Sequence, residues 1–298
     1  MPWLQTKEKI QLLGIYAHPH DLTHAIGTMG NHVKNGDAAT VAIVTDGGAT
    51  HNERLWEELH KEGAERNSDV TEQKRQEYAQ QKYEEAKTAC SYFGVTDVRF
   101  LGYKDKPLIR TDEMVETVVD LICEVRPDIL ITEVPALHWM DRTFVTPDDH
   151  STCSAVVTEA LIIAQHPHLD GDKQRIPHKP ARIYYMSPGQ PGDQVDVYID
   201  TSEWEEERIK AEMAYASQGH TPAYARQRVL RQCGSYGWSA GVNLAEKFLK
   251  GNRNVASYLP ITDLDLEHSR GSGIDHAVSV MGDEYREEAE RLLRAKAE

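Results

Sequence analysis

The first half of the chain alternates short apolar runs with longer stretches of helical periodicity. Apolar, β-branched runs that end in polar or glycine-containing turns predict strands at residues 11–17, 39–45, 98–103 and 128–134. The stretches between them predict helices at about 22–36, 71–93 and 112–125. This alternation predicts an α/β fold with a Rossmann-like, mostly parallel sheet and helices on both of its faces.

The second half is less regular. It predicts a helix at about 150–165, strands at 181–187 and 196–201, and a helix at 202–217. Residues 222–298 favour helix, with loop-like composition at 254–275. We therefore expect a single domain over residues 1–298, with its core at about 10–250 and a helical C-terminal extension at 251–298.

One connection in the first half differs in character from the others. The run at 51–77 is highly charged and long for a connection between a strand and a helix. We interpret it as a helical, solvent-facing insertion with no chemistry of its own.

Composition and charge exclude some partners. The 298 residues are 40% hydrophobic and 27% charged, and the net charge of -15 comes with no basic stripe that could neutralise the phosphates of a nucleic acid. No stretch has the 18 or more apolar residues of a membrane span, and the N-terminus lacks the features of a secretory signal. Four scattered cysteines without a CxxC pair favour a reduced, cytoplasmic protein and argue against a thiolate zinc site. We also expect a homo-oligomer.

Two polar clusters follow predicted strands that would be neighbours in the sheet. "HPHD" (18–21) follows the first strand, and "PDDH" (147–150) follows the fourth. If the strand order is 3-2-1-4-5, these two strands flank the point where the order reverses, which is where ligands bind in open parallel sheets. His18, Asp21 and His150 would then supply two imidazoles and one carboxylate, a common catalytic zinc set. Zinc, or another divalent metal, makes hydrolysis the natural chemistry.

The sequence leaves a purely structural explanation open for the same residues. Asp21 could cap the helix that follows it, and Asp148 or Asp149 could cap the helix that begins near residue 150. His18 and His24 could be partly buried side chains with satisfied hydrogen bonds.

The order of the motifs resembles that of the PIG-L/LmbE-like metal-dependent deacetylases, which remove acyl groups from amino sugars and related amines. Their first motif reads AHPDDE and their second HxDH, and here they stand as "AHPHDL" (17–22) and "PDDH" (147–150). Other stretches follow in the family's order over about residues 10 to 250, among them "VTDGGA", "FLGYKD", "RPDILIT" and "KAEMAYASQ". The resemblance implies that His18, Asp21 and His150 are metal ligands and that Asp149 orients a catalytic group or ligand.

Several positions depart from the family's pattern. His20 stands where the family has its general base Asp, Leu22 replaces the following Glu, and Pro147 replaces the first His of the second motif. Lys82 and Tyr215 stand where an Arg and a late His are common. Because an imidazole can accept a proton near neutral pH, we expect His20 to be the catalytic base. A role of His20 as an additional metal ligand stays open.

These observations predict a zinc-dependent hydrolase that cleaves an amide bond, deacetylating an amino sugar or a related N-acyl small molecule. His24, Asp46 and Trp139 are expected to line its substrate pocket. One alternative is a metal-dependent phosphoesterase or amidohydrolase, because "HPHD" is similar to the HxH pair of those enzymes. The other is a metal-binding member of the fold that is catalytically altered, because the usual base Asp is missing.

Overall fold

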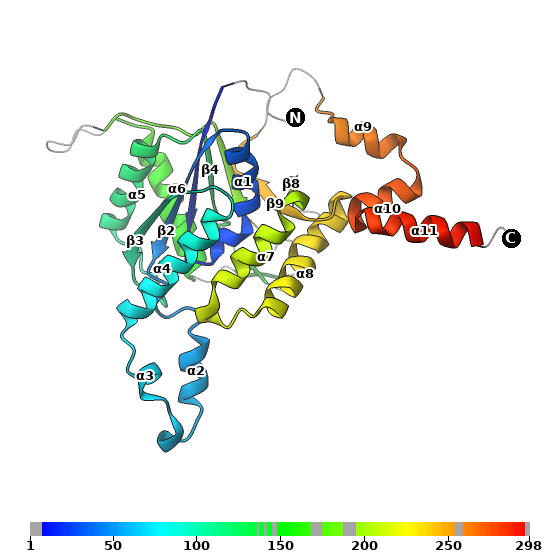
Figure 1. Cartoon of the computed structure of the whole chain (residues 1–298). Coiled ribbons are helices and arrows are strands. Elements are labelled where there is room, and N and C mark those ends of the chain that lie inside the picture. Colours follow the sequence, from blue (N-terminus) through cyan, green and yellow to red (C-terminus); the bar gives the residue numbers. More distant parts are fainter. Residues whose placement is uncertain are drawn as a thin grey trace.

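The computed structural model describes residues 8–135, 148–167, 175–186, 195–253 and 259–295, and the backbone of 137–139 and 142–144. Its centre is a sheet with helices around it (Figure 1). The sheet has seven strands in the order β3-β2-β1-β4-β7-β9-β8. The strands are β1 (Gln11–Tyr16), β2 (Ala38–Thr45), β3 (Asp97–Tyr103), β4 (Ile129–Glu133), β7 (Arg182–Met186), β8 (Val197–Asp200) and β9 (Ala245–Lys250). β3, β2, β1, β4 and β7 pair in parallel, which confirms the predicted order 3-2-1-4-5. β9 pairs antiparallel with β7 and β8.

Helices cover both faces of the sheet, as predicted. One layer contains α5 (Asp112–Val125) and α6 (Asp149–Ala164), and the other contains α1 (Ile26–Lys34), α4 (Arg75–Ser91) and α7 (Glu205–Ala214). Successive side chains of β1 alternate between the layers, so that Leu13 and Ile15 pack with α5 and α6 while Leu12 and Tyr16 pack with α1 and α4. Burial on both faces explains why the strand sequences are apolar almost throughout. α8 (Pro222–Ala240) packs on α7.

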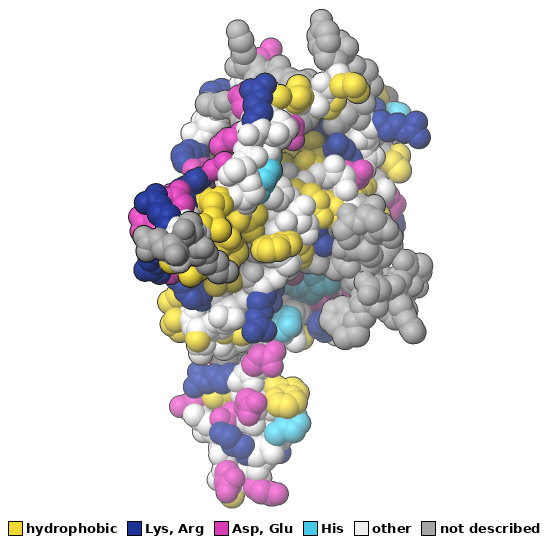
Figure 2. All heavy atoms as spheres, turned by 90° about the vertical axis from the view of Figure 1, so that its right-hand side faces the viewer, with side chains coloured by type: hydrophobic (Ala, Val, Ile, Leu, Met, Phe, Trp, Pro, Cys, Tyr) yellow, Lys and Arg dark blue, Asp and Glu magenta, His cyan; other side chains and the backbone are white. Residues whose placement is uncertain are grey.

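The charged connection after β2 is an insertion that projects from the rest of the chain (Figures 1 and 2). It contains α2 (Glu53–Leu59), a single 3-10 turn and α3 (Ser68–Thr71), and most of its residues are exposed. The expected helical, solvent-facing character is thus found over part of its length. Its first residues, His51 and Glu53, line a cavity beside His20.

Two expectations for the C-terminal part were wrong. β9 lies in a region expected to be helical, and the loop predicted at 254–275 contains α9 (Asp263–Arg270) and the start of α10 (Gly273–Met281). Both helices begin with a capping box, at Thr262 and at Ser272, where a side chain and the backbone exchange hydrogen bonds. Residues 254–258 of the predicted loop lie outside the described residues.

α11 (Asp283–Ala295) follows α10 at the end of the described chain, so the C-terminal part is helical there, as predicted. One further element was not predicted: β5 (Leu137–Trp139) forms a small antiparallel pair with β6 (Arg142–Phe144) after β4. The division of the chain into a core and an extension stays a prediction.

Gly237 of α8 lies against the backbone that leads into β9. A Cβ atom at this position would be 2.3 Å from the carbonyl oxygen of Asn243, whereas one at Gly234 of the same helix would meet only a Leu244 methyl at 3.9 Å. We expect Gly237→Ala to lower the free energy of unfolding by about 2–3 kcal/mol through overpacking. Gly234→Ala, the matched control, should raise it by about 0.5–1 kcal/mol because alanine favours helix. Urea unfolding of both variants measures this, and equal effects would contradict the close approach at Gly237.

Candidate functional site

The chain turns after β1 so that His18 and Asp21 face each other. The Asp21 N–H donates to the His18 carbonyl oxygen (3.1 Å), which leads into a 3-10 turn at Asp21–His24. Asp21 Oδ2 accepts from the His18 backbone N–H at 2.7 Å and lies 3.1 Å from His18 Nδ1. The Asp21 carboxylate therefore binds His18 and does not cap the turn that it begins.

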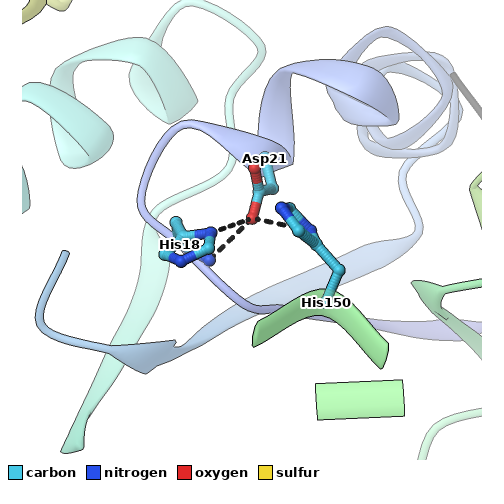
Figure 3. A group of neighbouring side chains, drawn as sticks. All are labelled: His18, Asp21 and His150. Atoms are coloured by element: carbon cyan, nitrogen blue, oxygen red, sulfur yellow. Dashed lines mark hydrogen bonds and ion pairs between the residues drawn. The ribbon is translucent and has the colours of Figure 1, made fainter. Parts of the chain in front are cut away.

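α6 brings His150 to the same point from the other motif. Asp148 caps this helix by accepting from the Ser151 N–H (2.8 Å), so the capping explanation is right for Asp148. His150 Nδ1 lies 3.7 Å from Asp21 Oδ2, and Figure 3 shows the Asp21 carboxylate between the two imidazoles. The ligand atoms of His18, Asp21 and His150 all lie within 4.8 Å of one another. We call these three residues the first group.

Asp149 holds the far side of the His18 ring. Its Oδ2 lies 2.9 Å from His18 Nε2, and its two oxygens accept from the backbone N–H groups of Lys106 (3.0 Å) and Leu108 (2.7 Å). A carboxylate on the second nitrogen of an imidazole fixes the ring orientation and the tautomer of a metal ligand. The contact supports an orienting role for Asp149.

Glu133, at the end of β4, approaches His150 at the same ring nitrogen that faces Asp21. Its Oε2 lies 3.4 Å from His150 Nδ1, and its Oε1 accepts from the Ala17 N–H at 3.1 Å. Glu133 is 3% exposed, and its burial raises the pKa of its carboxyl. The first group is thus surrounded by two further acidic side chains, Glu133 and Asp149.

The electrostatics of the first group favour a bound cation. Burial alone would lower the pKa of both imidazoles, but the neighbouring carboxylates raise that of His18 to about 9 and that of His150 to about 10. Burial would raise the pKa of Asp21, yet His150 and His18 hold it well below its usual range. A divalent cation can replace the protons that such imidazoles carry.

The donor set also fits a catalytic metal. Two imidazoles and one carboxylate leave a coordination position open, as in catalytic zinc sites. The His150 side chain is 35% exposed, whereas that of His18 is 3% exposed. The open side of the first group therefore lies at His150.

His20 points to a different group of residues. Its Nε2 lies 3.0 Å from Glu212 Oε2 of α7, and its ring packs edge-on against the rings of Tyr215 and His220. Burial would raise the pKa of Glu212, but His20, His220 and Arg228 hold it well below its usual range. His20 is therefore bound to an ionised carboxylate.

A cavity of about 370 Å³ adjoins His20. Its walls come from three separate parts of the chain: the turn after β1, the start of the insertion, and the segment after α7 together with the first turns of α8. The lining residues are His20, His51, Glu53, Gln218, Gly219, His220, Tyr224 and Arg228. Among the described residues of the two sequence motifs, His20 alone lines it.

The three residues expected to line the substrate pocket have different surroundings. The Asp46 carboxylate is bound by Arg75 Nε (2.9 Å) and by the Gly48 N–H (2.9 Å), so it fixes the turn after β2. His24 lies at the end of the 3-10 turn, with its Nδ1 3.2 Å from Gln232 Nε2 of α8. The side chain of Trp139 lies outside the described residues, as does Pro147.

His24 should make stability depend on pH. Its burial, together with Arg228 and His20, lowers its pKa to about 3, so the folded chain keeps it neutral where the unfolded chain binds a proton. The free energy of unfolding should therefore fall as the pH drops from about 6.5 towards 3, by up to about 1.4 kcal/mol per pH unit from this group. His24→Gln should lower the dependence of the free energy of unfolding on pH by the contribution of about one bound proton, up to about 1.4 kcal/mol per pH unit. Urea unfolding at pH 6, 5 and 4 measures this. An unchanged slope would mean that His24 is not held neutral.

Four residues around these groups were not predicted from the sequence: Glu133, Glu212, His220 and Arg228. Glu133 carried a usable signal, because it ends the strand beside β1 at the same edge of the sheet as "HPHD". The others carried none, since they belong to α7, α8 and the turn between them and meet His20 only through the tertiary fold.

Comparison with solved structures shows the fold. The 4-carboxy-2-hydroxymuconate hydratase GalB from Pseudomonas putida is 20% identical with a TM-score of 0.67, over 85% of this chain and all of that one. A conserved protein from Thermus thermophilus is 18% identical with a TM-score of 0.64, over 84% and 98% of the two chains. The N,N'-diacetylchitobiose deacetylase from Pyrococcus horikoshii is 18% identical with a TM-score of 0.62, over 90% and 89%. A comparison with curated proteins gave no significant match.

The sequence itself matches the PIG-L family, described as GlcNAc-PI de-N-acetylase, over residues 13–161, which is half of the chain. The match spans both polar motifs and the strands and helices between them. This match confirms, at the level of the family, the predicted class of enzyme: a deacetylase, which hydrolyses N-acyl amide bonds. The chain belongs to the PIG-L family.

Proposed function

We propose that the protein is a divalent-metal-dependent deacetylase that hydrolyses the N-acyl bond of a small molecule, such as an amino sugar. The convergence of His18, Asp21 and His150 carries the proposal, because it builds a metal-binding donor set at the switch point of the sheet. Membership of the PIG-L family supports the reaction class.

The first group would hold the metal, and zinc suits two imidazoles and a carboxylate with an open side. Such an ion supplies Lewis acidity toward the acyl carbonyl and makes water a nucleophile at neutral pH. Asp149 orients the His18 ring through the contact described above. Glu133 adds a negative charge beside His150 Nδ1, the nitrogen that faces Asp21. The buried walls around His18 and Asp21 exclude bulk water from their side of the site.

His20 is proposed to move the proton. Its Nε2–H donates to Glu212 Oε2, so in the neutral form of the ring the lone pair is on Nδ1. Nδ1 can take a proton from the attacking water and return it to the departing amine, as general acid–base catalysis requires. His24 and Trp139 stay proposed substrate contacts. Asp46 is proposed to shape the substrate pocket indirectly, by stabilising the turn after β2.

Addition of water to a carbon–carbon double bond is a second candidate. The structural similarity to a hydratase and the histidine in place of the family's base both favour it. Arg228 lines the same cavity as His20 and would suit a substrate that carries a carboxylate.

An assay of both reactions with one preparation tests the proposal. The full chain, loaded with one equivalent of zinc, is incubated with N-acetylglucosamine, N,N'-diacetylchitobiose and a panel of N-acyl amines, and acetate or acyl release is measured. Turnover that stops with a chelator and returns with zinc would support the deacetylase. Absence of acyl release, with hydration of 4-carboxy-2-hydroxymuconate, would favour the second candidate.

A cytoplasmic location and a homo-oligomeric state are also proposed. The four cysteines are unpaired in the structure, in agreement with a reducing compartment. Within the described part of the chain, no helix combines the length and the apolar character that a membrane span needs.

A further inference from the structure

A second set of metal-type donors lies next to the first group. His20, Glu212 and His220 place one ligand atom each within 4.8 Å of the others. Their side chains are 10%, 5% and 7% exposed, so all three are nearly buried. We call them the second group. It contains no residue of the first group, although His20 lies between His18 and Asp21 in the sequence.

The second group repeats the arrangement of the first. In the first group one carboxylate oxygen, Asp21 Oδ2, lies 3.1 Å from His18 Nδ1 and 3.7 Å from His150 Nδ1. In the second group one carboxylate oxygen, Glu212 Oε2, lies 3.0 Å from His20 Nε2 and 3.3 Å from His220 Nδ1. Two imidazoles and a carboxylate that meet at one oxygen are the donor set of a divalent cation such as zinc.

The neighbours of Glu212 leave this oxygen available. Arg228 Nε approaches the other oxygen, Oε1, at 3.3 Å, so it holds the carboxylate from behind. His220 Nδ1 also lies 3.0 Å from the Glu212 carbonyl oxygen, to which it donates when no cation is bound. A cation would replace this hydrogen.

The surroundings also set the order in which the two groups would fill. The first group has three acidic side chains around two imidazoles, namely Asp21, Glu133 and Asp149. The second group has a single carboxylate, whose charge Arg228 partly compensates. Because a cation binds more tightly where the net negative charge is larger, the first group fills first.

The adjoining cavity gives a cation at the second group access to water. His20 and His220 both line it, beside Glu53 and Gln218. Water molecules from the cavity can complete a tetrahedral shell around an ion with three protein ligands.

We propose that His20, Glu212 and His220 form a second, weaker divalent-cation site, and that an ion bound there inhibits the enzyme. The binding stands on the geometry alone. The inhibition rests on the proposed function, because it follows from the role of His20 in moving the proton. A cation bound to His20 Nε2 would replace the hydrogen bond to Glu212, and the ring could then no longer serve in proton transfer.

Zinc binding to the full chain tests the site without any assay of activity. The chelator-treated protein is titrated with zinc, and bound metal is counted by elemental mass spectrometry after equilibrium dialysis. We expect two zinc ions per chain for the wild type and one for His220→Ala, with the second dissociation constant raised at least about 100-fold. Glu212→Gln should behave like His220→Ala, and His166→Ala, an exposed histidine after α6, should still bind two. Saturation of the wild type at one ion, or a second ion that survives in both variants, would overturn the site.

Activity at one and at several equivalents of zinc then tests the inhibition. In the wild type, the rate at several equivalents of zinc should be at least about 10-fold lower than the rate at one equivalent. In His220→Ala the two rates should be nearly equal. Two bound ions with an unchanged ratio would overturn the inhibition and leave the site. If no preparation hydrolyses any N-acyl substrate, the proposed function fails, while the metal count still decides whether the second group binds a cation.

Discussion

Replacing His18 by alanine is expected to remove the metal of the first group and to lower amide hydrolysis by about 10³-fold or more, the upper end of the loss for one electrostatic stabiliser of a transition state. The reason lies in the geometry of the ring. Its Nδ1 lies 3.1 Å from Asp21 Oδ2, and its Nε2 is held by Asp149, and among the described residues His18 alone contacts both carboxylates. Elemental mass spectrometry of the purified variant and its rate of acyl release are the two measurements.

Asp149→Asn provides a graded comparison for the same ring. The amide keeps the shape of the side chain but loses the charge that orients His18, so metal affinity should fall about 10–100-fold while binding persists. His166→Ala is the control for loss of an exposed histidine and should change neither measurement. If His18→Ala keeps its zinc and its rate, the first group is not the metal site.

The first group could be predicted because both of its motifs follow strands of strong apolar pattern. β1 and β4 are buried on both faces, so their sequences are continuous apolar runs that identify them as strands. The rule that ligands bind where the strand order reverses then brings His18, Asp21 and His150 together. The rule needs only the order of the strands. It did not need the conformation of any loop.

The partners of His20 could not be predicted, because they meet it only through contacts between elements that are distant in the sequence. β9 reads "AEKFLK", a helix-favouring composition, and its strand conformation depends on the sheet that receives it. Its buried Glu246 accepts from the Gly27 and Thr28 N–H groups at the start of α1, and it binds Arg208. α7 is brought beside the turn after β1 by this network. Glu212, on α7, therefore meets His20 only once the sheet is complete.

Replacing His20 by glutamine is expected to lower kcat by about 10²–10⁴-fold, the range for loss of a general acid–base group. The glutamine amide can still donate to Glu212 Oε2, as His20 Nε2 does at 3.0 Å, so the packing around it should be kept. It cannot accept and return a proton. Zinc at the first group should be unchanged, since His20 contributes none of its three ligands. Steady-state kinetics at one equivalent of zinc, with the metal count beside it, measures both.

His24→Gln is the matched comparison for this variant, because it makes the same change in a histidine whose ring centroid lies 6.5 Å from that of His20. Because His24 is a proposed substrate contact, His24→Gln should raise KM and leave kcat within a few-fold of the wild type. Added imidazole should restore part of the rate of a His20→Gly variant, because a free base can enter the cavity that the ring adjoined. A full rate in His20→Gln with zinc bound would show that proton transfer uses another group. The altered first motif would then matter for the second group alone, where His20 would act as a metal ligand.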